Sequence, residues 1–337
     1  MLTRHLITLS TTTLIILILA GCSKAPSEIN LDYHARLNTQ LTLPELTPYQ
    51  DSKKLVVPTF SNIDASTIGI LQLNKLRHCQ LGQLIAERNS QLGKVSGPSS
   101  EFIYNVRFIQ MVPKCVATLN DAELTKQLNE VKQQKADLLF TYWEKMLFLD
   151  KQLASLYLPV SYSLLDVNQT QKQHTLNTLH YLASVKSALV NQEFNQINSA
   201  ELEAHLATLF KNSYLPSLLR ALYEQIFILQ QQNKALESVS FNDICKTGHN
   251  NQSATVLTNI FSKFYGSKIQ GYHNALLQEY MQVKPALLGL WQNHYHQPYK
   301  TDLKIHPLSL DTSLKHYSVT HVTWWQQLYK RCNIQPG

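Results

Sequence analysis

The sequence predicts an all-α protein, an elongated bundle of about seven to eight helices that follows an irregular, proline-containing N-terminal tether. From about residue 68 onward, apolar residues recur at spacings of three and four, the pattern of helices with one buried face. Only ten glycines occur among the 337 residues, and no run alternates apolar and polar residues between turn dipeptides, so a β-rich fold is disfavoured. No segment repeats at a fixed period, which argues against a solenoid.

Residues 1–21 are predicted to be a lipoprotein signal peptide. A weakly basic start with Arg4 precedes the apolar core 14–20, which is much shorter than the roughly 20 residues that cross a bilayer as a helix. The small residues before Cys22 resemble a bacterial lipobox, and this resemblance implies cleavage before Cys22 and attachment of a lipid to its thiol. Several acyl chains then hold a protein firmly on a bilayer. An ordinary cleaved signal peptide, in which Cys22 has no special role, is the alternative.

The residue after this cysteine bears on the compartment. Ser23 resembles the signal for outer-membrane export in enteric-type lipoproteins, so we expect a lipid-anchored envelope protein at the bacterial outer membrane, facing the periplasm. Loss of residues 1–21, whose only charged residue is Arg4, leaves 316 residues and lowers the formal charge from +7 to +6. Scattered Lys and Arg residues permit contact with anionic lipids or cell-wall carboxylates, but in an exported chain they predict no nucleic-acid partner.

Cysteine usage predicts two disulfides. Besides Cys22, the chain contains Cys79, Cys115, Cys245 and Cys332. An even number of cysteines in an exported chain indicates disulfides, and four cysteines allow three pairings. Residues 70–92 and 98–118 are predicted helices, and Gly97 in the loop between them is the midpoint of Cys79 and Cys115. Antiparallel helices place such residues side by side, so we expect this pair to form a disulfide that stabilises the fold by roughly 4 kcal/mol, and the remaining pair to form the other. Four free thiols or a redox pair are the alternatives, and the absence of a Cys-x-x-Cys motif disfavours the latter.

The tether and lead-in extend over residues 22–60 and contain four prolines. Within them, residues 55–57 are the one short strand that the sequence predicts. A helical domain over 61–337 follows, with a sub-boundary near 240–252.

The longest predicted helix covers residues 121–157. Asn120 is expected to cap it, with Glu123 in the position of a capping box, and only Lys135 interrupts its apolar face. At 1.5 Å per residue this helix would span about 55 Å. Further helices are expected over 170–191, after a cap at Asn198, from Pro216, over 254–291 with breaks near Gly266 and Gly271 and a kink at Pro285, and over 321–331.

A polar cluster at the turn of the first helical pair is the candidate binding surface. Its members are Glu87, Arg88, Asn89 and Lys94. The sequence around Gly93 fails as a phosphate loop, because Arg88 stands where Walker A needs glycine and Val95 where it needs Ser or Thr. Gly93 is instead expected to end the first helix in a left-handed conformation, and Pro98 to begin the next. The alternative reading of the polar cluster is a solvated helix end.

The stretch CQLGQLIAERNSQLGKVSGPSS, residues 79–100, followed by Tyr104, Phe108 and Cys115, resembles a family of uncharacterised proteobacterial lipoproteins that is grouped only as a domain of unknown function. The early Leu31-Asp32-Tyr33 and the proline-containing lead-in are similar to that family as well. The resemblance supports the lipoprotein prediction and implies no activity, cofactor or catalytic residue.

Histidines near the C-terminus are the weak candidates for metal binding. His294 and His296 offer imidazoles that suit zinc or copper, but no Glu or Cys stands beside them at the spacing of a metal site. Neither H-E-x-x-H nor G-x-S-x-G occurs, so no metal, cofactor or catalytic residue is predicted. Trp324 and Trp325 are expected to fix the last helix in the core, with only one of them facing fully inward.

Two functions are compatible with this sequence. The preferred one is a non-enzymatic binding or adaptor lipoprotein, whose partner is an envelope protein or the cell wall. The alternative is a hydrolase or other enzyme that acts on a cell-wall or lipid substrate, with a site built from Glu87 and Arg88 or from the C-terminal histidines. A polar cleft holding a carboxylate or histidine of shifted pKa would favour the enzyme.

Overall fold

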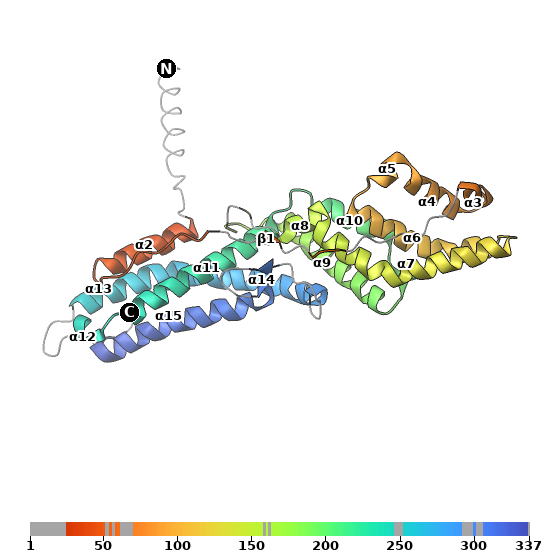
Figure 1. Cartoon of the computed structure of the whole chain (residues 1–337). Helices are drawn as coiled ribbons and strands as arrows, with labels where there is room; N and C mark the ends of the chain where they lie inside the picture. The colour runs from red at the N-terminus through yellow and green to blue at the C-terminus, as the bar shows by residue number, and fades with distance from the viewer. Residues whose placement is uncertain are drawn as a thin grey trace, which may run out of the picture. The chain divides into compact units, whose positions relative to one another are not determined.

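A computed structural model describes residues 25–50, 54–55, 58–60, 70–157, 160, 163–245, 252–291, 299–300 and 306–335 (Figure 1). The predicted signal peptide, Cys22, His294 and His296 lie outside these residues. Within the described part of the chain, no helix is long and apolar enough to cross a membrane.

Helices make up almost all of the regular structure. In chain order the elements are α2 (Pro26–Asn38), β1 (Lys54–Leu55), α3 (Ile70–Lys75), α4 (Gln80–Asn89), α5 (Gln91–Lys94), α6 (Pro98–Val116), α7 (Ala122–Leu149), α8 (Lys151–Tyr157), α9 (Gln169–Val190), the 3₁₀-helix η2 (Phe194–Gln196), α10 (Ser199–Thr208), α11 (Tyr214–Glu237), α12 (Phe241–Ile244), α13 (Gln252–Ile260), the π-helix η3 (Phe261–Ile269), α14 (Gln270–Trp291), β2 (Tyr299–Lys300), the 3₁₀-helix η4 (Pro307–Ser309) and α15 (Leu310–Cys332).

The all-α prediction is confirmed. Nine α-helices of ten or more residues lie in the described part of the chain, with shorter helices between them, so the expected seven to eight was slightly too low. The β-structure of the same residues is limited to one antiparallel pairing, in which Lys54 faces Lys300 and Leu55 faces Tyr299. Leu55 is the one residue of the predicted strand that the structure describes. The elongated outline stays a prediction.

The chain divides into two compact units. Unit 1 comprises residues 1–46, 231–272 and 322–337, and unit 2 comprises residues 47–230 and 273–321.

Unit 1 is built around aromatic side chains. Helix α2 packs against the π-helix η3, and the ring centroids of the buried Tyr33 and Tyr265 lie 6.0 Å apart. Trp325 is fully buried, as expected for one member of the tryptophan pair. The disulfide Cys245–Cys332 closes this unit, with the two Cα atoms 5.4 Å apart.

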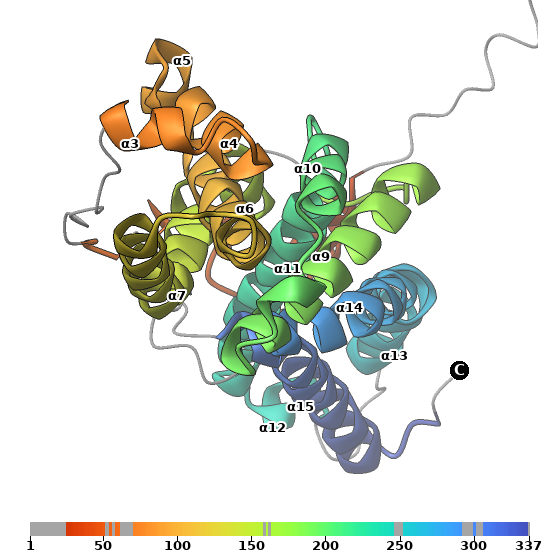
Figure 2. The same cartoon turned by 90° about the vertical axis from the view of Figure 1, so that its right-hand side faces the viewer.

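The helical hairpin of unit 2 contains the other disulfide. Figure 2 shows α4 beside α6, α5 next to α4, and α7 beside α6 on another face. Cys79 and Cys115 are joined with their Cα atoms 5.6 Å apart, which is the pairing that the midpoint at Gly97 predicted. An apolar core beneath the disulfide includes Leu84 and Phe108.

The predicted helix over 70–92 was wrong, because three short helices replace it. The chain turns at residues 76–79, where the amides of Cys79 and Gly82 donate to the carbonyls of Leu76 and Cys79. This turn lies so close to α4 that a Cβ atom on Gly82 would stand 2.3 Å from the carbonyl oxygen of Leu76. Glycine is therefore needed here for close approach of the backbone.

Two further expectations about helix ends were wrong. Asp121, not Asn120, caps α7, and its Oδ1 accepts from the Leu124 amide at 3.0 Å. The helix ends at Leu149 rather than at residue 157, because the Asp150 carboxylate accepts from the amides of the next helix and begins α8.

Gly93 also differs from its expected role. It lies inside the short helix α5, and it has no positive φ. A Cβ atom there would stand 2.3 Å from the Glu87 carbonyl oxygen and 2.4 Å from that of Arg88, so space, not backbone handedness, requires glycine. Pro98 begins α6, as predicted. Pro285 lies within α14.

Candidate functional site

A buried lysine lies at the centre of the α4–α6–α7 cluster. Lys135, the residue that interrupts the apolar face of α7, is only 7% exposed. Its Nζ donates to Asn105 Oδ1 at 2.7 Å. The same atom lies 5.0 Å from the centroid of the Tyr104 ring and 5.2 Å from that of Phe108, which are cation–π distances. Sequence periodicity marked this position as an exception but gave no partner for it.

The electrostatics of this cluster are unusual. The pKa of Lys135 is lowered to about 8, mainly by burial and also by the nearby Arg88 charge, while Glu101 opposes the change. Lys135 forms no ion pair with any residue that the structure describes. Burial also raises the pKa of Tyr104 to about 12. The cluster therefore holds an ammonium group that gives up its proton more readily than an exposed lysine.

Arg88 supports the turn around α5. Its guanidinium donates to the Gly93 carbonyl at 2.8 Å, to Ser96 Oγ, and to Glu101 Oε1 at 3.4 Å. The guanidinium carbon lies 5.5 Å from the Tyr104 ring centroid. With these contacts Arg88 holds α4, α5 and α6 together.

The other predicted surface residues are only partly brought together. Glu87 is exposed and accepts from Gln83 Nε2 at 2.9 Å, and Asn89 is exposed as well. The Lys94 side chain lies outside what the structure describes. Glu87 and Arg88 line one small pocket of about 180 Å³, here called the tip pocket. The remaining lining residues are Leu84, Ser96, Ser100, Ile103, Tyr104, Arg107 and Glu203.

Two exposed aliphatic residues at this turn were missed. Leu92 and Val95 are 83% and 80% exposed, the highest values among the large apolar side chains that the structure describes. The sequence contains a signal for them, because both lie within two residues of Gly93, which stands in the short segment between the two predicted helices.

A larger groove lies between α6 and the start of α10, and is here called the α6–α10 groove. It has a volume of about 720 Å³. Its lining residues are Arg107, Gln110, Met111, Pro113, Lys114, Asn195, Ile197, Asn198, Ser199 and Ala200. Two of these side chains are cationic and none is a carboxylate. Arg107 also lines the tip pocket, so the two hollows are neighbours on the same face of α6.

A third hollow, of about 740 Å³, lies on the other side of the 190–196 segment and is here called the α7 groove. It shares Pro113 and Asn195 with the α6–α10 groove. Its charged lining residues are Lys132, Asp137 and Glu193, so carboxylates predominate there.

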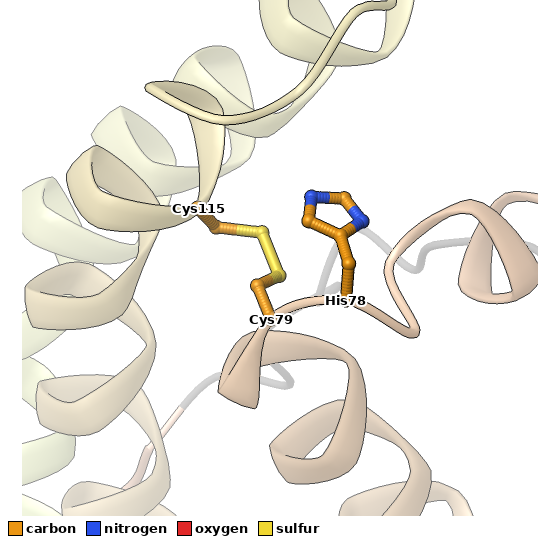
Figure 3. Close-up of side chains that lie close together, drawn as sticks. All are labelled: His78, Cys79 and Cys115. Atoms are coloured by element: carbon orange, nitrogen blue, oxygen red, sulfur yellow. A yellow bond between two sulfur atoms is a disulfide. The ribbon is translucent and has the colours of Figure 1, made fainter.

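His78, Cys79 and Cys115 place their ligand atoms within 4.8 Å of one another. Figure 3 shows the His78 imidazole beside the disulfide that joins the two cysteines. Sulfur atoms bonded to each other are not thiolates, which are the form that binds a metal, so this trio is not a metal site in the oxidised protein.

Two buried histidines in unit 2 were not singled out by the sequence. His273 Nε2 lies 3.0 Å from Gln225 Oε1, and His273 Nδ1 lies 3.4 Å from Ser318 Oγ. Burial lowers the pKa of His273 to about 4. The pKa of His321 is lowered to about 3, mainly by burial and also by the neighbouring His273. Neither histidine lines any of the three hollows described above.

Comparison with known proteins adds one finding. A protein-family model, described as a protein of unknown function (DUF3080), matches residues 30–336. No curated protein and no solved structure matches the chain significantly. The family match agrees with the resemblance to a domain of unknown function, while the lipoprotein character stays a prediction.

Proposed function

We propose that this chain, which belongs to the DUF3080 family of proteins of unknown function, is a lipid-anchored protein of the bacterial cell envelope that acts by binding another envelope component. The lipobox-like residues before Cys22 support the anchor, and Ser23 supports a position at the outer membrane, facing the periplasm. In this proposal, the lead-in after Cys22 tethers the helical part of the chain close to the membrane.

The exposed turn at α5 carries the binding part of the proposal. Leu92 and Val95 lie three residues apart and leave most of their apolar surface in water. Single exposed apolar residues are common on proteins, but a pair of them on one turn is a candidate centre for a protein contact.

This turn is held in a defined shape, which favours binding. Ser90 Oγ accepts from the Gly93 amide at 3.1 Å, and Arg88 donates to the Gly93 carbonyl from the other side. The disulfide between Cys79 and Cys115 joins the helices that carry the turn. A surface that is already ordered loses less conformational entropy when a partner binds.

The test is photo-crosslinking in living cells with a photoreactive residue at position 91, which is exposed beside Leu92. The matched control carries the photoreactive residue at position 319, where Val319 is also exposed and lies in the same unit. We expect one dominant envelope protein to be captured from position 91 and not from position 319.

Two variants make this result specific. Leu92→Ser combined with Val95→Ser should abolish the capture without unfolding the chain, because exposed substitutions of this kind change stability little. Cys22→Ser should release the protein from membranes, or leave it unprocessed, and should also reduce the capture. Equal capture from both positions, or no capture by a folded and anchored protein, would contradict the proposal.

A further inference from the structure

The α6–α10 groove has an electrostatic character that the α5 turn lacks. Its two charged lining residues, Arg107 and Lys114, are both cationic. We infer that this groove binds an extended acidic segment of the partner protein. The inference rests on the proposed function, because it names the chemistry by which the envelope partner is recognised.

Both cations are available for a ligand. Neither Arg107 nor Lys114 forms a hydrogen bond or an ion pair with the residues that the structure describes, and Lys114 is exposed. Arg88, in contrast, already donates to three oxygen atoms within its own turn. A guanidinium without a partner is well suited to a carboxylate, which it can bind through two parallel hydrogen bonds.

The spacing of the two cations favours two separate anionic groups over a single one. Arg107 and Lys114 are seven residues apart on α6, which corresponds to about 10 Å along the helix axis. Carboxylates three residues apart on a polyproline-II segment are separated by about 9 Å and point to the same side, so each could meet one of the two cations. The groove volume of about 720 Å³ is also large enough for a ligand much bigger than a single small anion.

The remaining lining residues suit a peptide. Asn195 offers an amide that can both donate to and accept from a peptide backbone, and the half-buried Met111 and the exposed Pro113 provide apolar contact surface. The chemistry of the groove therefore combines charge recognition with backbone and apolar recognition.

One wall of the groove is fixed before any ligand binds. Gln110 Nε2 donates to the carbonyls of Phe194 and Ile197 at 2.7 and 2.9 Å, which holds the 194–197 segment on α6. Tyr181 Oη donates to the Asn198 carbonyl at 2.7 Å and accepts from the Asn198 amide at 3.1 Å. Asn198 Oδ1 already accepts from the amides of Ala200 and Glu201, so these first amides of α10 are not free for a ligand. The positive charge of the groove therefore comes chiefly from Arg107 and Lys114.

The neighbouring hollows limit where an acidic segment can lie. Glu87 and Glu203 line the tip pocket, and Asp137 and Glu193 line the α7 groove. In the α7 groove the carboxylates outnumber the single cation, Lys132, and repel an acidic chain. In the tip pocket the two glutamates offset Arg88 and Arg107, so the stretch between Arg107 and Lys114 is the most favourable for an acidic segment.

The experiment measures binding of a fluorescein-labelled octapeptide, with glutamates at its third and sixth positions and alanines elsewhere, to the purified full chain. The same peptide with glutamines in both positions is the matched ligand control. We expect the glutamate peptide to bind, the glutamine peptide to bind roughly tenfold more weakly, and added salt to reduce the difference.

Charge reversal locates the site. The double variant Arg107→Glu and Lys114→Glu should weaken glutamate-peptide binding by roughly tenfold or more. The control is Arg77→Glu with Lys315→Glu, which changes the net charge equally at two exposed positions of the same unit, and it should change binding less than about twofold. Circular dichroism checks that both double variants fold.

Four outcomes would overturn the inference: equal binding of the two peptides, equal weakening by the two double variants, no binding of either peptide, or binding of anionic phosphatidylglycerol vesicles through Arg107 and Lys114 in place of the peptide. If the peptide fails while position 91 still captures one envelope protein, the groove inference fails and the proposed function stands. If position 91 captures nothing, the proposed function fails by its own test.

Discussion

Lys135 lies where an all-apolar α7 face would place a leucine or a valine. Its ammonium is nearly excluded from water and has one amide oxygen and two aromatic rings as neighbours. A buried charge without an ionic partner destabilises the folded state, and a lowered pKa is the measure of this cost.

Replacing Lys135 by Met should therefore leave the chain as stable as the wild type or make it more stable at pH 7. Met has a similar length and no charge, so it fills the space without the desolvation penalty. Urea unfolding of the two proteins, followed by circular dichroism, measures the difference in the free energy of unfolding.

The pH dependence of the difference in unfolding free energy between the wild type and Lys135→Met tests whether the buried charge is its cause. The pKa of Lys135 is about 8 in the folded chain, below its value in the unfolded chain, so the unfolded state binds the extra proton between these values. The wild type should consequently gain about 2 kcal/mol relative to Lys135→Met between pH 7 and pH 9.5. If the difference in the free energy of unfolding stayed constant over this range, burial would not lower the pKa of Lys135.

At the scale of elements, the turn at residues 76–79 and the close approach at Gly82 decide how the first hairpin is built. Gly82→Ala should destabilise the protein by about 2 kcal/mol, because the added Cβ atom overlaps the Leu76 carbonyl. An ordinary glycine inside a helix behaves in the opposite way, since alanine is the better helix former.

Gly271 provides the matched control for this substitution. It lies in α14, and apart from the adjacent residues and the backbone of its own helix no atom stands within 4 Å of where its Cβ would be, so Gly271→Ala should stabilise by about 0.5 to 1 kcal/mol. Thermal unfolding of both variants gives the comparison, and a melting temperature that rises in Gly82→Ala would refute the role assigned to that turn.

These elements also show what a sequence can predict. The pairing of Cys79 with Cys115 followed from their equal distance to Gly97, although the first of the two predicted helices is broken, because an intervening turn did not change which residues face each other. The ends at Asp121 and Asp150 were missed, because several neighbouring polar residues are comparable caps and tertiary packing selects among them.

At the scale of the whole molecule, the candidate site could be predicted only in part. Arg88 was found in the sequence, but its contacts show that it supports the turn. The α6–α10 groove joins residues 107–114 to residues 195–200, and no local pattern announces that such distant segments meet. Lys114 and Arg107 look like ordinary surface cations until the fold shows that no carboxylate lines the groove with them.

The buried histidines make the stability of unit 2 depend on pH. His273 and His321 are neutral in the folded chain, with pKa values of about 4 and about 3, but both take up protons near their ordinary pKa when the chain unfolds. Their stabilising effect is complete above the unfolded pKa and is lost as the pH falls toward the folded values, because the unfolded state then binds more protons.

We expect the free energy of unfolding to fall by about 2 kcal/mol per histidine between pH 7 and pH 5. His34, which lies in unit 1 and whose pKa is also lowered by burial, contributes in the same direction, so the wild-type total alone does not assign the effect. His306 in unit 2, whose pKa is also lowered by burial, contributes in the same direction. His321→Met removes one of the two most deeply buried histidines of unit 2, and its unfolding free energy should lose about 2 kcal/mol less than that of the wild type over the same interval. His316→Met is the matched control, because His316 is exposed on the same helix, and it should follow the wild type. Urea unfolding at the two pH values makes the comparison, and equal losses in His321→Met and His316→Met would mean that the buried histidines do not control the acid stability of this protein.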